Sequence, residues 1–347
     1  MAEASAPGKI MLVGEYAVLE GAPAIVAAIN VRARAQVVAI SGPESVFFDA
    51  LSGRAYYFVI DGSTGLRWVG DHPEANGTIL EAVIASCCEH SALFVDGPSF
   101  RISMHTDEFF TNGGGHRVKL GVGSSAAALV AFVGALMAEL NLAPTAEELL
   151  AVCHAAHRRF QGGIGSGADI ATALYGGVVV VRSTTAPETI SAAACAWPDN
   201  LLAMPIWSGV SASTPELLTR FNAFKAASPD QHHHHLRRLK TLSEQACTVW
   251  SEQSISDILD TLTSYDEALC SFDAEAGIGI CIEPHARIRQ LVEKHGAVYK
   301  TSGAGGGDFG LALSDSNKAL DAIRTDCLEA GFEVLDRIFA VEGLTVS

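Results

Sequence analysis

The chain has 347 residues, of which 49% are hydrophobic and 18% charged, so it carries enough apolar material for a large buried core. This composition excludes a disordered or collagen-like protein. The 23 Lys and Arg against 39 Asp and Glu give a net charge of −16, which argues against a protein that coats nucleic acid. An anionic substrate is not excluded, because a local pocket can oppose the global charge.

The eight cysteines contain no Cys-x-x-Cys pair, and free cysteine is usually buried. We therefore expect reduced, mostly buried thiols in a cytoplasmic protein. Residues 1–7 are too short and too mildly apolar for a signal peptide, and apolar stretches such as 126–140 are shorter than a membrane span. We expect no membrane and no nucleic acid as a partner, and the sequence leaves open whether the protein is a monomer or a homodimer.

Short apolar or alternating runs separated by glycine and proline predict strands early in the chain. These runs cover 10–13, 24–29, 32–40, 47–59 and 100–104. A helix is expected over 76–91. The clearest helix covers 124–140, because this segment is rich in Ala and Leu and has Ser124 or Ser125 available as its N-cap.

The next segments alternate helix and strand. Residues 145–148 form a capping box that opens a helix to about residue 159. A short helix is expected over 167–175 and a buried strand over 178–181. Further on, helical patterns dominate, at 215–227, 236–253, 255–272, 284–295 and 317–330, with strands at 309–313 and 332–341. The pattern is mixed α and β, with more strands in the N-terminal half.

The segment 119–127 (KLGVGSSAA) places glycines before two serines at the start of the clearest helix. Glycines let a backbone approach an anion closely, and the first turn of a helix offers N–H groups without internal partners. Together they predict a phosphate-binding loop in which Ser124 or Ser125 ligates Mg²⁺. A tight turn with an ordinary serine cap fits the spacing equally well, and the sequence lacks the P-loop pattern.

Two charged residues stand in settings that suit catalysis. Lys9 follows Pro-Gly and precedes a strand, where an ammonium can neutralise a phosphate or lower the pKa of a substrate hydroxyl. Asp169 follows the glycine-rich run 162–167 and begins a helix, where a carboxylate can accept or orient a hydroxyl proton. Taken alone, each has a simpler explanation, as a surface lysine and as a helix cap.

Three further features have both a functional and a simpler explanation. The glycine loop 303–307 can close over a substrate or be a flexible turn. The run His232–His235 has metal-ligating side chains, but adjacent residues point in different directions, so an exposed loop is expected. Asp257 and Asp260 have helical spacing and are expected to form a solvated helix face rather than a metal site.

In this order and at these separations, the motifs resemble those of the GHMP small-molecule kinases, from residue 5 to about residue 313. The matching segments are 5–9 (SAPGK), 121–126 (GVGSSA), 165–169 (GSGAD) and 303–307 (GAGGG). Within that family, four features are similar to the phosphomevalonate kinases. They are Glu15-Tyr16 in place of Glu-His, the Lys119-Leu-Gly approach to the first loop, the segment 161–169, and the segments 207–214 and 305–308.

One position departs from the mevalonate kinase pattern. Arg158 stands where mevalonate kinases have a metal-binding Glu, eleven residues before the aspartate. The departure argues against a metal site of that type. Arg158, Arg159 and Lys119 are instead candidates for holding an additional substrate phosphate.

The resemblance implies an α+β protein with the two-domain GHMP kinase fold. An N-terminal α/β domain, like domain 2 of ribosomal protein S5, would cover 1–183, and a ferredoxin-like α+β domain would cover 184–347, with the active site in the cleft between them. The implied activity is transfer of the ATP γ-phosphate to 5-phosphomevalonate, giving 5-diphosphomevalonate. Mevalonate or another small alcohol is the alternative acceptor, and a non-catalytic binding protein of the same fold is a third possibility.

The same resemblance implies a role for each motif residue. Lys9 and Asp169 would be catalytic, with Mg²⁺ on Ser125. The ATP phosphates would lie on Gly121, Gly123, Ser124, Ser125 and Ala126. The acceptor would contact Lys9, Glu15, Tyr16, Ser166, Ser208, Ser213, Gly303, Ala304 and Gly305.

Overall fold

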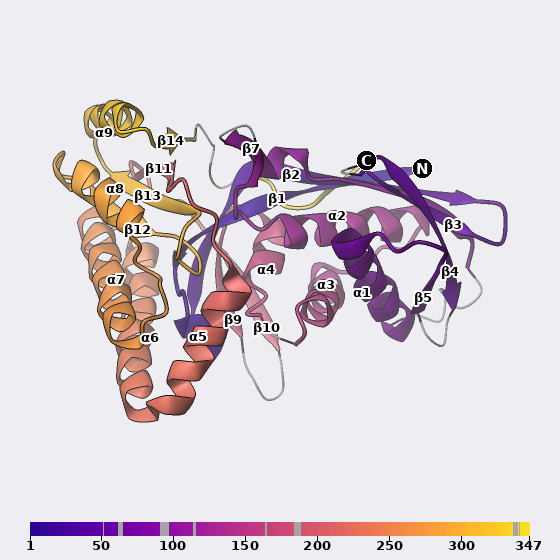
Figure 1. Cartoon of the computed structure of the whole chain (residues 1–347), viewed down its shortest axis with the longest axis horizontal. Coiled ribbons are helices and arrows are strands. Elements are labelled where there is room, and N and C mark those ends of the chain that lie inside the picture. Colours follow the sequence, from indigo (N-terminus) through magenta and orange to yellow (C-terminus); the bar gives the residue numbers. More distant parts are fainter. Residues whose placement is uncertain are drawn as a thin grey trace.

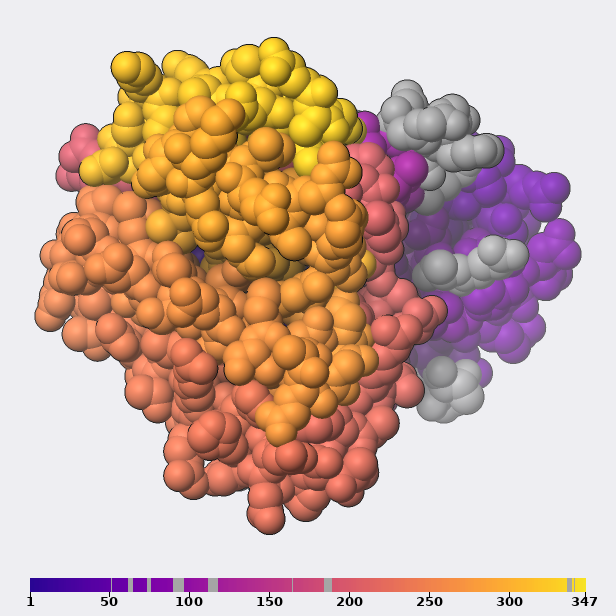
Figure 2. Space-filling model, turned by 60° about the vertical axis from the view of Figure 1, so that its left-hand side comes forward, coloured from indigo at the N-terminus to yellow at the C-terminus, as the bar shows by residue number. Residues whose placement is uncertain are grey.

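A computed structural model describes most of the chain. The described residues are 1–50, 52–61, 65–90, 97–113, 116–163, 165–183, 189–335, 339 and 341–347. Figure 1 shows an N-terminal half in which helices cover one face of a large sheet, and a C-terminal half in which helices surround a smaller sheet. Figure 2 shows the C-terminal half, coloured red to yellow, in front of the indigo and purple N-terminal half.

The first sheet is built on a long antiparallel pair, β1 (Ala2–Val13) with β2 (Ala24–Ile40). The segments 24–29 and 32–40, which we expected to be separate, form one strand. The first six residues of β2 are all buried, and burial alternates along the rest of the strand. The sheet order is β10-β9-β2-β6-β3-β4-β5, with β1 joined to β2 and β15. Its other strands are β3 (Ser45–Asp49), β4 (Arg54–Asp61), β5 (Gly65–Val69), β6 (Ser99–His105), β9 (Val178–Ser183), β10 (Ile190–Cys195) and β15 (Thr345–Val346).

Four helices cover one face of this sheet, namely α1 (Glu74–His90), α2 (Ser124–Glu139), α3 (Ala146–Phe160) and α4 (Ala168–Tyr175). Helix α2 packs against both β1 and β2, and its Ala- and Leu-rich residues are almost all buried. The capping box at Thr145 is confirmed. The predicted serine cap of α2 is wrong: its N-cap is Gly123 in the left-handed conformation, and Ser124 and Ser125 lie within the first helical turn.

The second sheet has the order β12-β13-β11-β14. Its strands are β11 (Leu202–Trp207), β12 (Val298–Thr301), β13 (Phe309–Ser314) and β14 (Glu333–Val334). The surrounding helices are α5 (Thr214–Ala227), α6 (Pro229–Glu252), α7 (Ile255–Ala276), α8 (Glu283–Glu293) and α9 (Asn317–Glu329). The predicted strand 332–341 is limited to β14 and an isolated bridge between Phe339 and Ile29, while 336–338 and 340 lie outside the described residues.

The histidine run does not form the exposed loop that we expected, because helix α6 begins at Pro229 and includes it. His232 and His235 face the core and are buried, which leaves only two ring side chains of the run at the surface. The ring of His235 pairs with Glu275 of α7. The expectation for Asp257 and Asp260 is confirmed, since both lie on the exposed face of α7.

The predicted domain division at 183/184 stays a prediction. Strand β10 lies beyond this point and pairs with β9 of the first sheet, and β15 near the end of the chain pairs with β1. Two small elements connect the halves, the 3-10 helix η1 (Ala17–Glu20) and the hairpin of β7 (Phe110–Gly113) and β8 (His116–Lys119). A further 3-10 turn, η3 (Asp107–Phe109), precedes β7.

One apolar cluster joins the two halves. It contains Ile10 and Leu12 from β1 together with Trp250, Tyr265 and Phe272 from α6 and α7, all of them buried. Because this cluster is shared, the end of β1 is held firmly against the helices of the C-terminal half. None of the helices in the described part of the chain has both the length and the apolar composition to cross a membrane.

The expectation that all the cysteines are reduced is wrong for two of them. Cys270 and Cys281 form a disulfide, with their Cα atoms 5.6 Å apart. This pair could not be predicted from the spacing of the cysteines, because helix α7 ends between the two residues and the chain then folds back. The other six cysteines are free, and Cys87, Cys153 and Cys327 are buried as expected.

Candidate active site

The first glycine loop, residues 121–125, leads directly into α2. Gly121 and Gly123 have φ values of 70° and 85°, a conformation that favours glycine. A Cβ on Gly121 would lie 2.1 Å from the carboxyl carbon of Asp308, and one on Gly123 would lie 3.2 Å from Cγ of Lys9. The loop is therefore closely covered, and the first N–H groups of α2 point out of the helix beside it.

The two serines of this loop differ in exposure. Ser124 is buried, with 7% of its surface exposed, whereas Ser125 is half-buried. A hydroxyl that ligates a cation must reach the cleft, so Ser125 is the better candidate of the two. Ala126 follows in the same turn and is fully buried.

Lys9 lies between the two glycine loops. Its backbone N–H donates to the carbonyl oxygen of Val122, at 2.9 Å, which fixes β1 against the first loop. Its Nζ is 3.9 Å from the position that a Cβ on Gly303 would occupy. The half-buried ammonium of Lys9 is thus placed where an anion bound to either loop would meet it.

The second glycine loop, residues 303–307, is anchored by a buried ion pair. The carboxylate of Glu15 pairs with the ammonium of Lys300, and both side chains are almost fully buried. Glu15 also accepts a hydrogen bond from the N–H of Gly303, at 3.3 Å. Burial raises the pKa of Glu15, and the charge of Lys300 acts against this shift.

Two hydroxyl groups fasten the same loop to the end of β1. The hydroxyl of Tyr16 donates to the carbonyl oxygen of Ala304, at 2.6 Å. Ser302 Oγ accepts from the N–H of Met11, at 3.0 Å, and donates to the carbonyl oxygen of Met11, at 2.9 Å. Oε1 of Glu15 and the hydroxyl of Tyr16 are therefore engaged with the loop itself, while Oε2 of Glu15 has no hydrogen-bond partner among the described residues. The contact that we expected both residues to make with the acceptor stays a prediction.

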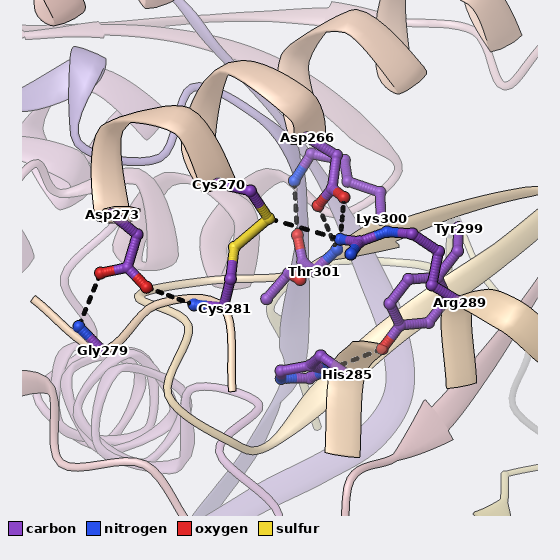
Figure 3. The surroundings of a disulfide bond; sticks show 10 residues. All are labelled: Asp266, Cys270, Asp273, Gly279, Cys281, His285, Arg289, Tyr299, Lys300 and Thr301. Carbon is purple, nitrogen blue, oxygen red and sulfur yellow. Dashed lines mark hydrogen bonds and ion pairs between the residues drawn. A yellow bond between two sulfur atoms is a disulfide. The ribbon is translucent and has the colours of Figure 1, made fainter. Parts of the chain in front are cut away.

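The segment after α7 supports the second loop, and Figure 3 shows its disulfide and the contacts of Asp273 with Gly279 and Cys281. The N–H of Gly306 donates to the carbonyl oxygen of Ile280, at 2.8 Å, and a Cβ on Gly305 would lie 2.4 Å from the Ile280 side chain. Asp273 accepts from the N–H groups of Gly279, at 2.6 Å, and of Cys281, at 2.8 Å. The disulfide therefore closes the segment on which the second glycine loop rests.

His285 completes this support. One ring nitrogen lies 3.0 Å from the carbonyl oxygen of Gly307, and the other lies 2.6 Å from the hydroxyl of Tyr299. Burial lowers the pKa of His285 to about 4, so the ring is neutral near neutral pH. A neutral imidazole has one donor and one acceptor, which suits a carbonyl oxygen on one side and a hydroxyl on the other.

Asp308 ends the second loop and is the site residue that our sequence analysis missed. It has a φ of 55°, and its carboxyl group lies directly over Gly121. Oδ1 accepts from the N–H of Ala212, at 3.2 Å. Burial raises the pKa of Asp308, while the charges of Lys9 and Lys119 oppose the rise. The GGGD sequence was a signal, but only the fold brings the carboxyl group to the first loop.

The segment 208–213 adjoins Asp308. The N–H of Ser208 donates to the carbonyl oxygen of Asp308, at 2.9 Å, and the Ser208 hydroxyl donates to the carbonyl oxygen of Val210, at 3.1 Å. Ser208 is buried, whereas Ser213 is half-buried and precedes α5. Of the two serines predicted to contact the acceptor, Ser213 therefore has the more accessible hydroxyl.

Asp169 lies in the first turn of α4, after Gly167 in the left-handed conformation. Its Oδ1 accepts from the N–H of Ile170, at 3.0 Å, and its Oδ2 faces Nε2 of His157, at 3.6 Å. Ser166 Oγ accepts from the N–H of Ala168, at 3.3 Å. Strand β1, which carries Lys9, packs against both α2 and α4, so one strand contacts both helices whose first turns hold candidate residues.

The three basic residues that are candidates for holding an additional phosphate differ in the partners that they already have. Arg158 donates to the carbonyl oxygen of Gly163, at 2.6 Å, and Arg159 pairs with Glu89, at 2.6 Å. Lys119 is exposed, and its positive charge acts to lower the pKa of Asp308. An additional phosphate near the two glycine loops would therefore meet Lys119 more readily than the arginines.

A metal ion would have to be held mainly by its substrate. Among the described residues, no group of three or more His, Cys, Asp and Glu side chains could hold a metal ion. Mg²⁺ typically binds to one or two protein oxygens together with substrate phosphates and water. The hydroxyl of Ser125 beside a loop of free N–H groups fits that arrangement.

Comparisons with known proteins show what this chain is similar to. Residues 82–177 match the model of the GHMP kinases N terminal domain. A phosphomevalonate kinase from Streptomyces sp. (strain CL190) is 26% identical over 98% of this chain and 97% of its own. The Lin0012 protein from Listeria innocua superposes with a TM-score of 0.87 at 21% identity, covering 100% of this chain and 99% of that one. Streptococcus pneumoniae phosphomevalonate kinase, solved with phosphomevalonate and AMPPNP, superposes with a TM-score of 0.81 at 19% identity, covering 98% and 100%.

Proposed function

We propose, from the GHMP kinase N-terminal domain at residues 82–177 and the GHMP kinase fold of the whole chain, that this protein is an ATP-dependent kinase. Its reaction is transfer of the ATP γ-phosphate to 5-phosphomevalonate, giving 5-diphosphomevalonate. The observation that carries the proposal is the position of Lys9 between the two glycine loops, with Gly123 on one side and Gly303 on the other.

The first loop suits the nucleotide phosphates. Gly121 and Gly123 bring the backbone close to the bound anion, and the N–H groups of Ser124, Ser125 and Ala126 belong to the first turn of α2, where the helix dipole is positive. Mg²⁺ supplies charge neutralisation when it is bound, and Ser125 is the residue that we assign to it. Lys9 adds a second positive charge at the point where the phosphate leaves the nucleotide.

The acceptor is placed between Lys9, Asp169 and the half-buried Ser213. Both the acceptor and the nucleotide carry phosphate, so their approach requires positive charge in the cleft. Lys9 and Lys119 supply it, although the whole chain has a net charge of −16. Asp169 positions the attacking oxygen, and the second loop, with Gly303, Ala304 and Gly305, covers it. Glu15 and Tyr16 position that loop, because both contact it directly.

A coupled assay of ADP release tests the proposal, with 5-phosphomevalonate and mevalonate offered separately. We expect turnover with 5-phosphomevalonate, and we expect Asp169→Asn to lower kcat by about 100-fold or more, the usual range for a proton-transfer group. The relatives that are phosphomevalonate kinases support this acceptor. Preference for mevalonate would mean that mevalonate is the acceptor. Nucleotide binding without turnover on either compound would indicate a binding protein rather than a kinase.

A further inference from the structure

His157 occupies an unusual position beside Asp169. It comes from α3, its side chain is only 2% exposed, and its Nε2 faces Asp169 Oδ2 at 3.6 Å. Among the residues that the structure describes, Nε2 has no hydrogen-bond partner. An unpaired buried nitrogen is costly, by about 1–3 kcal/mol, so its position calls for a physical reason.

The His157 ring is held in place by its neighbours. Phe160, one turn further along α3, stacks on it with ring centroids 6.1 Å apart and an interplanar angle of 28°. His154, one turn earlier, packs so closely on Gly167 that a Cβ there would lie 2.6 Å from the His154 ring. Helix α3 thus contacts the start of α4 at two successive turns, and His157 is the contact that faces the carboxylate.

The carboxylate of Asp169 is only partly fixed by its own helix. Oδ1 accepts from the N–H of Ile170, while Oδ2 has the His157 ring nitrogen beyond hydrogen-bond distance, at 3.6 Å. The side chain is 22% exposed, so part of it is accessible from outside the protein. A small movement of Asp169 toward α3 would make a charge-assisted hydrogen bond from Nε2–H to Oδ2. Hydrogen bonds at catalytic sites often tighten only when the substrate is bound.

We propose that His157 is a positioning residue, which orients the Asp169 carboxylate toward the acceptor by donating from Nε2 to Oδ2 in the substrate complex. This inference rests on the proposed function, because it assigns Asp169 to the acceptor. A carboxylate held by two donors on one side presents a defined edge to the substrate oxygen, and such orientation lowers the barrier of a transfer reaction.

Two substitutions of His157 distinguish the contribution of its nitrogen donor from the contribution of its ring shape. His157→Phe keeps a ring on Phe160 but removes the donor, whereas His157→Gln keeps an N–H donor at a similar distance from the backbone. We expect kcat to fall about 10- to 100-fold in His157→Phe, as for a lost positioning contact, with the KM for ATP unchanged, and to recover most of this loss in His157→Gln. Equal kcat in His157→Phe and the unsubstituted protein would overturn the inference, as would equal losses in both variants.

The matched control is the pair of His295 and Asp326 in the C-terminal half, whose side chains lie 2.8 Å apart. Its variant His295→Phe removes the nitrogen donor of a histidine next to an aspartate outside the cleft, as His157→Phe does beside Asp169, and kcat should stay unchanged. If kcat fell as much as in His157→Phe, loss of a histidine–aspartate contact anywhere in the protein would lower turnover, and the inference would fail.

A second measurement needs no substrate. In protein labelled with ¹⁵N-histidine, the Nε2 resonance of His157, identified by its absence in His157→Gln, should shift in Asp169→Asn because the facing charge is gone. An unmoved resonance would overturn the inference whatever the activity. If the protein instead fails to phosphorylate 5-phosphomevalonate while the resonance shifts, the proposed function fails and the contact between His157 and Asp169 stands.

Discussion

The two glycine loops of the cleft are alike in sequence but are held in place by different means. The first loop, 121–125, is shaped by its own backbone, by the helix that it opens and by the strand of Lys9. The second loop, 303–307, is held by side chains from far along the chain, including a buried ion pair, a tyrosine hydroxyl and a histidine. The first loop is thus held by backbone contacts, including the hydrogen bond from Lys9 of β1 to Val122, whereas the second loop depends on side chains that the packing of both halves brings to it.

This difference predicts where substitutions affect stability and where they affect only turnover. Residues around the first loop can lose their chemistry without loosening the fold, because backbone hydrogen bonds keep the loop in place. Residues around the second loop are buried between the halves, so substituting them lowers the free energy of unfolding.

The largest effect is expected from Lys300→Met. Removing the ammonium leaves Glu15 buried and unpaired, and breaking such a pair costs about 3–5 kcal/mol. Urea unfolding would measure the loss. The matched control is Lys9→Met, which should abolish turnover but change the free energy of unfolding by less than about 0.5 kcal/mol, as for a side chain outside the core. The double variant Glu15→Gln with Lys300→Met should recover part of the loss.

Equal destabilisation by Lys9→Met and Lys300→Met would contradict the difference between the two loops. That outcome would mean that the ammonium of Lys9, which is half-buried, contributes to the fold as much as the buried pair does. The first loop could then no longer be distinguished from the second by its dependence on backbone contacts rather than on buried side chains.

A smaller loss is expected from opening the disulfide. Replacing Cys270 and Cys281 by serine removes the closure of a segment whose ends are separated by 11 residues. The chain-entropy estimate for a closed loop of this size is about 3 kcal/mol. Urea unfolding should show the double variant less stable by that order, and the KM for substrate should rise because Ile280 supports the second loop.

Free cysteines provide the control for this prediction. Cys195→Ser with Cys247→Ser changes two part-buried thiols that form no disulfide. Its cost should stay below about 1 kcal/mol. A dithiol reductant should bring the unsubstituted protein to the stability of the Cys270→Ser, Cys281→Ser variant and should not affect that variant. No response of the unsubstituted protein to reductant would contradict the role given to the disulfide.

These two loops also show how far the sequence alone could go. The first loop, its helix and the capping box at Thr145 were predictable, because their physics is contained in short stretches of chain. Lys9 was expected to precede a strand, but it lies within β1, which begins at Ala2 and continues through Pro7 and Gly8 with a shift in register. The serine cap was misjudged because Gly123 takes the cap position in a conformation that a serine adopts less readily.

The surroundings of the second loop could not be predicted in this way. Glu15 meets Lys300 across 285 positions of the chain, and Tyr16 meets Ala304 across 288. Nothing near either residue in the sequence marks its partner, so Glu15 was assigned to the substrate instead. Asp308 was missed for the same reason, since its role depends on which segments the two halves bring together. The disulfide was missed for a local reason, because its two cysteines are 11 residues apart and meet only where the chain folds back after α7.

Tyr16→Phe should have a modest effect on the second loop. The ring, which packs on Phe221 and Phe272, is retained, and only the hydrogen bond to Ala304 is lost. The expected cost is about 1 kcal/mol, the net worth of one hydrogen bond. Tyr57→Phe is the control, because Tyr57 is 50% exposed, and it should change the unfolding midpoint in urea very little. Equal midpoints for the two variants would show that the Tyr16 hydroxyl does not hold the loop.

Asp308 connects the two loops, and its substitution is expected to change how the free energy of unfolding depends on pH. Burial raises the pKa of Asp308 above its ordinary value. The folded protein therefore binds this proton more tightly than the unfolded chain does, and the free energy of unfolding falls as the pH rises from the ordinary pKa through the folded one. Asp308→Asn removes that fall, so the variant should gain stability relative to the unsubstituted protein as the pH rises toward neutrality.

Asp326 provides a control of opposite sign. Hydrogen bonds from Lys294 and His295 lower the pKa of Asp326, so its contribution to stability is present above its ordinary pKa and is lost as the pH falls through the folded value. Asp326→Asn should therefore lose stability near neutral pH and match the unsubstituted protein in acid. Urea midpoints measured from acidic to neutral pH would test both variants. If Asp308→Asn followed the same direction as Asp326→Asn, the Asp308 carboxyl would be stabilised by Lys9 and Lys119 more than it is penalised by burial, and the two loops would be joined by an ion pair rather than by a buried acid.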